Sequence, residues 1–174
     1  MSKTLILIPS RMSATRLPGK PLLKINNLSI ISHVVYKAKK AKIGDVVVCT
    51  EDQEILHEVE KNGGKGILTS KNHKTGTDRI YEGFKKLNIK DVDYILNLQG
   101  DEPAIDENDI IKLNKLMIEN DSEIGTLAAE INDSLIFDNE NIVKVITNKK
   151  LYQDSFQLAL DFKRKNLSKI KKNI

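Results

Sequence analysis

Apolar and polar positions along this chain alternate between two periods. Four short, nearly continuous apolar runs predict buried strands, at residues 4–8, 45–50, 65–69 and 94–98. Apolar residues at three- and four-residue spacing predict helices over residues 30–41, 52–62, 77–87 and 107–118. Asp52 is the expected N-cap of the second helix, and Asn62-Gly63-Gly64 is expected to end it. Strands alternating with helices predict an α/β protein, a three-layer sandwich with a mostly parallel (mixed) central sheet.

The positive charge of the chain is concentrated at its C-terminal end. The net charge is +4 over 174 residues, yet residues 161–174 hold six cations against one aspartate, a local charge of +5. The first 160 residues therefore carry −1, so the body of the protein is not basic. No aromatic residues are interleaved among these cations as a nucleic-acid surface would need, and no helix-turn-helix pattern is present. We therefore expect no nucleic-acid partner.

Composition predicts one cytoplasmic domain with a hydrophobic core. Hydrophobic residues make up 40% of the chain, which suffices for one domain of this length. The single cysteine, Cys49, lies in an apolar run, which predicts a buried, reduced thiol and suits the cytoplasm. The apolar N-terminal run meets Pro9 and Arg11 almost at once, so it predicts a strand rather than a signal peptide. Because no run approaches the roughly 20 apolar residues that span a bilayer, no membrane insertion is expected.

The first predicted strand runs into a cationic loop, residues 9–22, with the sequence PSRMSATRLPGKPL. In an open α/β sheet, ligands bind beyond the carboxyl ends of the strands, where this loop begins. Arg11 and Arg16 offer forked donors for phosphate, Lys20 adds a mobile charge, and Gly19 permits close approach of the backbone. A nucleoside triphosphate would neutralise these charges; a solvated basic turn is the alternative. The loop is neither a Walker A nor a GxGxxG motif, which disfavours P-loop hydrolases and dehydrogenases.

An acidic turn, LQGDEP at residues 98–103, follows the fourth predicted strand. It should open onto the same sheet edge as the cationic loop, so that Asp101 faces the phosphate-binding side chains. Mg²⁺ favours one or two carboxylates together with phosphate oxygens, which makes Asp101 the candidate metal ligand, with Glu102 as a weaker candidate. A simple turn before a helix is the alternative.

A third motif, HKTGTDR at residues 73–79, stands at the start of a predicted helix. Thr75 or Thr77 could cap that helix, and its N-terminal amides would attract an anion or a base carbonyl. A plain capped helix with a surface Arg79 is the alternative. His73 is expected to be exposed to solvent rather than catalytic.

Together these motifs resemble the sugar-activating nucleotidyltransferases, most closely the 3-deoxy-manno-octulosonate (Kdo) cytidylyltransferase, or CMP-Kdo synthetase, family. The similar segments are IPSR and SATRLPGKP within residues 8–21, then TGTDR and QGDEP. Ala14 is a small departure, because the family usually has Ser-Thr-Arg where this chain has Ala-Thr-Arg. The resemblance extends from residue 4 to about residue 147 and implies a nucleotidyltransferase (nucleotide-diphospho-sugar transferase-like) fold.

The resemblance also implies a role for each motif. It implies that Mg²⁺ binds Asp101, and that this aspartate forms the catalytic set with three cations that hold the CTP phosphates: Arg11, Arg16 and Lys20. It further implies a nucleotide site with seven more members. Thr75, Gly76, Thr77 and Arg79 are expected to read cytosine, Gln99 to contact the substrate, and Pro9 and Ser10 to bind the nucleotide.

By the same resemblance, residues 1–150 correspond to an incomplete cytidylyltransferase domain and residues 151–174 to an atypical lysine-rich tail. Family members carry a later portion with sugar-acid residues, a second Mg²⁺ aspartate and much of a homodimer interface, for which this sequence shows no counterpart. The expected reaction transfers CMP from CTP to Kdo, giving CMP-Kdo and pyrophosphate for lipopolysaccharide biosynthesis. The alternatives are a cytidylyltransferase for another sugar acid, such as sialic acid, and a catalytically silent nucleotide-binding fragment.

Overall fold

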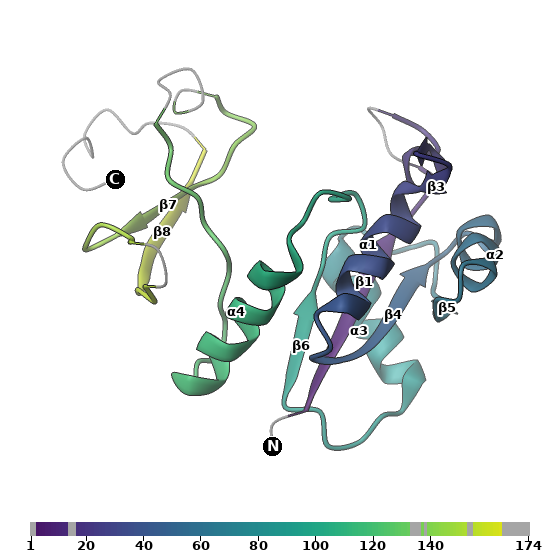
Figure 1. Ribbon diagram of the computed structural model, residues 1–174, viewed down its shortest axis with the longest axis horizontal. Helices are drawn as coiled ribbons and strands as arrows, with labels where there is room; N and C mark the ends of the chain where they lie inside the picture. Colours follow the sequence, from purple (N-terminus) through teal and green to yellow (C-terminus); the bar gives the residue numbers. More distant parts are fainter. Residues whose placement is uncertain (1–2, 14–16, 133–136, 138, 153–154, 165–174) are drawn as a thin grey trace. The chain divides into compact units, whose positions relative to one another are not determined.

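The four predicted strands form one parallel sheet. The computed structural model (Figure 1) describes residues 3–13, 17–132, 137, 139–152 and 155–164. The strands are β1 (Thr4–Ser10), β4 (Gly44–Thr50), β5 (Gly66–Leu68) and β6 (Tyr94–Asn97). Their order is β5-β4-β1-β6, and every ladder of this sheet is parallel. The chain divides into two compact units, Met1–Asp121 and Ser122–Ile174, and this sheet belongs to the first.

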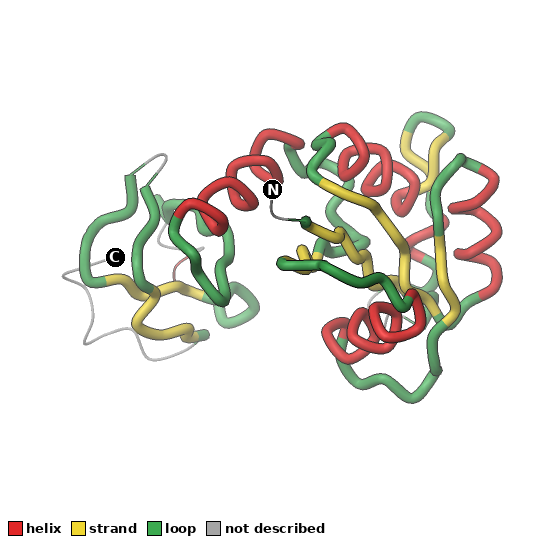
Figure 2. The backbone as a smooth tube through the Cα atoms, turned by 90° about the horizontal axis from the view of Figure 1, so that it is seen from below, coloured by secondary structure: helices red, strands yellow, loops and turns green. Residues whose placement is uncertain are grey.

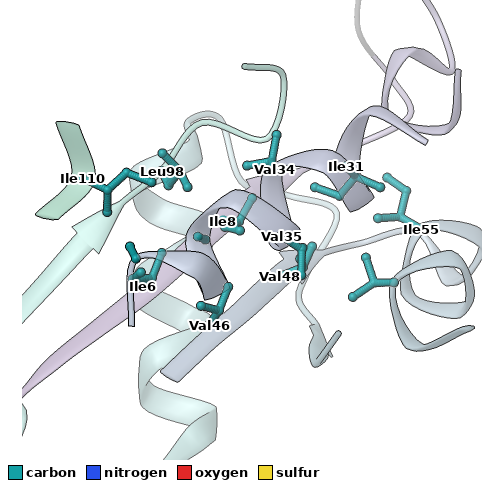
Figure 3. Packing of buried hydrophobic residues seen from close by; sticks show 13 residues of the cluster. Ile6, Ile8, Ile31, Val34, Val35, Val46, Val48, Ile55, Leu98 and Ile110 are labelled. Carbon is teal, nitrogen blue, oxygen red and sulfur yellow. The ribbon is translucent and has the colours of Figure 1, made fainter. Parts of the chain in front are cut away.

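Helices cover both faces of the sheet, which confirms the predicted three-layer α/β class (Figure 2). On one face lie α1 (Ile30–Lys40), α2 (Gln53–Lys61) and α4 (Glu107–Glu119), and on the other lies α3 (Gly76–Leu87). The first face buries the cluster drawn in Figure 3, which includes Ile6, Ile8, Val46 and Val48 from the strands and Ile31, Val34, Ile55 and Ile110 from the helices. Among the described residues, no helix has the length and apolar character needed to cross a membrane.

The opposite face of β1 and β4 meets α3. Alternate strand residues point to opposite faces, so Leu5, Leu7 and Cys49 pack against Ile80 of this helix. The predicted buried thiol is confirmed: burial raises the pKa of Cys49 to about 12. α3 approaches β4 so closely that a Cβ on Gly83 would lie 2.4 Å from the Cys49 sulfur.

Three short elements between the first strand and the first helix were not predicted. They are a 3₁₀ turn, η1 (Lys20–Leu22), and a hairpin of β2 (Lys24–Ile25) and β3 (Leu28–Ser29). The hairpin turns at Asn26 and Asn27, whose φ angles of 48° and 66° lie in the left-handed region that asparagine tolerates. Strands of two residues are too short to produce a recognisable alternation of apolar and polar positions.

The second unit contains an antiparallel pair, β7 (Lys144–Thr147) and β8 (Ala159–Lys163). Lys144 is buried, and its ammonium donates to the backbone carbonyls of Asn139 and Arg164. The ladder joins residues on either side of position 150. The predicted division there, between a cytidylyltransferase domain and a lysine-rich tail, stays a prediction.

Candidate functional site

The strand order places a topological switch point between β1 and β6. From β1 the chain passes to β4 and β5 on one side of the sheet, and then crosses to β6 on the other side. In an open α/β sheet, ligands bind beyond the carboxyl ends of the strands at such a switch point. A cavity of about 280 Å³ lies here. Its lining combines all three sequence motifs: Pro9, Ser10, Arg11, Lys20, Pro21, His73, Thr75, Gly76, Arg79, Gln99, Gly100 and Asp101.

The structure brings nearly all the predicted site residues to this one cavity. Among them, Thr77 is exposed and does not line it. Arg16 lies outside the described residues. Pro21, His73 and Gly100 line the cavity without having been predicted as site residues.

The cationic loop is held by hydrogen bonds at its base. The amide of Met12 donates to Asp52 Oδ2 at 2.7 Å, and the Met12 carbonyl accepts from the amide of Gly19 at 3.0 Å. Gly19 has a φ of +73°, which favours glycine. The hydrogen bond between Met12 and Gly19 brings these two parts of the loop together, and Lys20 follows directly after Gly19.

Lys20 and Asp101 meet across the cavity mouth. The distance from Lys20 Nζ to Asp101 Oδ2 is 2.8 Å, and the two side chains are 32% and 56% exposed. An ion pair this accessible contributes only about 0–1 kcal/mol, so both groups remain available to a stronger partner. The loops can approach because residue 100 is glycine: a Cβ there would lie 2.7 Å from the Pro9 carbonyl oxygen.

Ser10 adds a buried hydroxyl to the cavity lining. The residue is only 7% exposed and lines the cavity. Within the part of the chain that is described, its Oγ is the buried side-chain oxygen without a hydrogen-bond partner. Buried polar atoms are nearly always satisfied, so this hydroxyl is suited to a bound ligand or water.

The opposite wall is the N-terminus of α3. Of the two predicted caps, Thr75 is the one observed: its Oγ1 accepts from the amide of Asp78 at 3.1 Å. The Asp78 carboxylate accepts from the amide of Thr75 in return, completing a capping box. Free amides at such a terminus favour negative charge in the cavity.

Arg79 is buried, so the alternative of a surface arginine is wrong. Its guanidinium pairs with the Glu51 carboxylate and donates to Thr69 Oγ1 at 2.7 Å. The Arg79 and Glu51 side chains are 3% and 11% exposed. Neither partner was predicted; the available signal was the position of Glu51 directly after β4, at the carboxyl edge of the sheet. The role of Arg79 in reading cytosine stays a prediction.

His73 is half-buried at the cavity wall, so its predicted exposure to solvent is wrong. Its Nε2 contacts the carboxylate of Glu82, which also accepts from Lys86 Nζ at 2.7 Å and from the amide of Ser70 at 2.9 Å. The hydrogen bond from Lys86, followed by those from Ser70 and His73, lowers the pKa of Glu82 to about 2. This network fixes residues 70–73 to α3.

Metal-ligating side chains are sparse at the cavity. Asp101 is the carboxylate in its lining, and Glu102 is exposed outside it. Over the described ranges, no group of three or more His, Cys, Asp or Glu side chains is arranged to hold a metal ion. Any Mg²⁺ at Asp101 would therefore take further oxygen ligands from substrate phosphates and water.

Comparison with known proteins agrees with this geometry. Residues 5–173 match the cytidylyltransferase family. The chain belongs to that family. It is 46% identical to the 3-deoxy-manno-octulosonate cytidylyltransferase of Thermodesulfovibrio yellowstonii over 155 residues, which are 86% of this chain and 61% of that protein. The corresponding enzyme of Afipia carboxidovorans is 43% identical, over 92% of this chain and 65% of its own length. The chain thus spans about three fifths of the length of these curated relatives.

Solved structures confirm the nucleotidyltransferase fold. CMP:2-keto-3-deoxy-manno-octonic acid synthetase complexed with CTP superposes with a TM-score of 0.81 at 33% identity, covering 98% of this chain and 69% of that one. A 4-diphosphocytidyl-2C-methyl-D-erythritol synthase superposes with a TM-score of 0.62 at 17% identity, covering 94% and 72% of the two chains. The second likeness concerns the fold alone.

Proposed function

We propose that these residues form the CTP site of a CMP-Kdo synthetase. The observation that supports this most directly is the meeting of the three sequence motifs in one cavity at the switch point of the sheet. The similar synthetase solved with CTP covers 98% of this chain. Because the chain spans about three fifths of its curated relatives, CTP binding is proposed for these 174 residues. Transfer of CMP to Kdo is proposed for the whole protein to which these 174 residues belong.

The triphosphate is proposed to lie between the cationic loop and the N-terminus of α3. Arg11 can bind two phosphate oxygens at once, and Lys20 can follow the charge as a mobile donor. Arg16 is proposed for the same role on sequence alone. The hydroxyl of Ser10, which has no hydrogen-bond partner among the described residues, can give a ligand one further hydrogen bond inside the cavity.

Asp101 is proposed to hold Mg²⁺ together with the CTP phosphates. The residues fit this ion, because a single exposed carboxylate beside a phosphate-binding loop leaves room for the phosphate and water oxygens that Mg²⁺ prefers. The ion would supply positive charge at the reacting phosphate. Lys20, released from Asp101, would then donate to the phosphates.

The proposed reaction is a displacement at the α-phosphorus. A hydroxyl oxygen of the sugar acid forms a bond to the α-phosphorus, and the hydroxyl proton passes to solvent. The bond between the α-phosphorus and the oxygen that bridges it to the β-phosphate breaks, and pyrophosphate leaves. Arg11, Arg16 and Lys20 stabilise the negative charge that grows on pyrophosphate. The protein contributes positioning and charge, with no covalent intermediate on a side chain.

Two alternatives remain to be separated by experiment. One is a nucleotide-binding chain that does not transfer CMP. A cytidylyltransferase for another sugar acid would share the same CTP site. Calorimetry with Mg²⁺ should show CTP binding. ATP should compete weakly because the Thr75–Arg79 turn is proposed to read cytosine, whereas the phosphate contacts do not distinguish the bases. Mass spectrometry after incubation with CTP, Mg²⁺ and either Kdo or sialic acid then identifies the acceptor; failure of CTP to bind would contradict the proposed function.

A further inference from the structure

The turn after β4 contacts both walls of the cavity. Glu51 pairs with Arg79 of α3, and Asp52 accepts from the amide of Met12 in the cationic loop at 2.7 Å. The amide of Asp52 donates to the buried Thr50 Oγ1 at 3.1 Å, which fixes the turn itself. Neither Glu51 nor Asp52 lines the cavity.

Asp52 occupies the N-cap position of α2, yet its side chain makes no capping hydrogen bond. Aspartate is favoured at this position because its carboxylate usually accepts from an amide of the first helical turn. Here the carboxylate accepts from Met12 instead, in a charge-assisted hydrogen bond across 40 residues of sequence. The side chain is therefore committed to the loop rather than to its own helix.

Met12 links Asp52 to the part of the loop that lines the cavity. Its carbonyl accepts from the amide of Gly19 at 3.0 Å, which holds two points within the loop together. Lys20 follows Gly19 directly and faces Asp101. A chain of contacts thus leads from Asp52 through Met12 and Gly19 to the ammonium group of Lys20.

We infer that Asp52 is a positioning residue for the phosphates of CTP. Asp52 does not line the cavity; it holds Met12 so that the loop presents Lys20 to Asp101. The inference rests on the proposed function, since it assumes that the cavity binds CTP. Without this bond, the loop samples more conformations, and binding must then order it at a cost in affinity.

The test compares three substitutions in the complete chain. Asp52→Ser keeps a residue that caps helices well, but its hydroxyl lies one atom nearer the backbone and cannot reach Met12. Asp52→Asn keeps an acceptor oxygen at the original length. Asp106→Ser makes the same change at the N-cap of α4, where the aspartate does accept a capping bond, from the amide of Asn108 at 2.9 Å. Asp106 does not line the cavity.

Calorimetric titration with CTP and Mg²⁺ should show about tenfold weaker binding for Asp52→Ser, the scale of one hydrogen bond to a charged group. Asp52→Asn should restore most of that affinity. Asp106→Ser should bind CTP as the unmodified protein does, and because serine also caps helices well, thermal unfolding should change little. Unchanged affinity in Asp52→Ser would overturn the inference.

A double-mutant cycle separates positioning from a general loss of structure. If Asp52 acts through Lys20, Asp52→Ser should weaken CTP binding little further in a Lys20→Ala background. Equal losses in both backgrounds would assign Asp52 a purely structural role and overturn the inference. Absence of CTP binding by the unmodified protein would instead contradict the proposed function itself.

Discussion

The two units of the chain differ in how they bury apolar side chains. Both hydrophobic clusters seen among the described residues belong to residues 1–121. In residues 122–174, Ile146 is the buried hydrophobic side chain among those described, whereas Leu158, Leu160 and Phe162 are more than half exposed. A two-stranded ladder with little apolar packing is marginally stable in water. Among the described residues, the first unit therefore has apolar clusters of its own, whereas buried apolar side chains are sparse in the second.

This difference matters for function because every residue that lines the cavity comes from residues 1–121. Binding groups keep their geometry when rigid elements and secondary contacts hold them. Here β1, β4 and β6 set the loop ends, and the Glu51–Arg79 and Asp52–Met12 contacts hold the loops. We therefore expect substitutions in the first unit to alter stability and CTP binding far more than matched substitutions in the second.

The largest difference in the free energy of unfolding is expected between substitutions of two ion-paired glutamates, Glu51 and Glu130. Glu51→Ala leaves the buried Arg79 charge without its carboxylate and should lower the free energy of unfolding by about 3–5 kcal/mol. Glu130 pairs with Lys150 in the second unit, where the side chains are 57% and 58% exposed, so Glu130→Ala should produce no measurable loss. Urea denaturation followed by circular dichroism compares them. Similar losses for both variants would contradict the contrast between the units.

Apolar truncation should give the next largest contrast. Ile6 is fully buried in the cluster of Figure 3, so Ile6→Ala should cost about 2–5 kcal/mol of unfolding free energy. Leu160 is 57% exposed in β8, and Leu160→Ala should stay within about 0.5 kcal/mol. The same denaturation experiment measures both. A loss of unfolding free energy at Leu160 as large as that at Ile6 would show that the apolar packing of the second unit contributes as much to stability as that of the first.

The smallest contrast concerns acid sensitivity. Glu82 ordinarily titrates near 4.5 and in the folded protein near 2, so its stabilising effect is complete above about pH 4.5 and is lost as the pH falls toward 2. The stability difference between the unmodified protein and Glu82→Gln should therefore shrink across that range. Asp161 in the second unit has its pKa lowered by a hydrogen bond from Lys163, but its side chain is 47% exposed. Asp161→Asn should change the pH dependence of stability less, and urea midpoints measured between pH 7 and pH 2 compare the two variants. A pH-independent stability difference between the unmodified protein and Glu82→Gln would contradict the hydrogen-bond network around Glu82.

Much of the first unit was predictable because its signals are local. The apolar run of β1, the helical spacing in α1 and the TGTD capping sequence of α3 each lie within one short segment. The meeting of the cationic loop with Asp101 was also predictable, because both follow the carboxyl ends of strands in one parallel sheet. Local pattern and sheet topology were sufficient there.

The contacts that hold the site were not predictable, since they depend on packing between distant segments. Arg79 meets Glu51 only because α3 lies against β4, an approach that Gly83 permits at Cys49. His73 is half-buried where it contacts Glu82, a residue in the second turn of α3. The bond from Met12 to Asp52 follows from the packing of the loop beside α2. No local period in the sequence encodes these distances.

The central claim is that the cavity at the switch point binds CTP with Mg²⁺ through Asp101. Calorimetric titration of CTP, with and without Mg²⁺, tests it in the unmodified chain, in Asp101→Asn and in the control Glu102→Gln, whose side chain lies outside the cavity lining. The unmodified protein and Glu102→Gln should bind CTP more tightly when Mg²⁺ is present. Asp101→Asn should bind weakly and without that dependence, because it lacks the carboxylate that joins metal to phosphate. Equal Mg²⁺-assisted affinity in all three proteins would contradict the account.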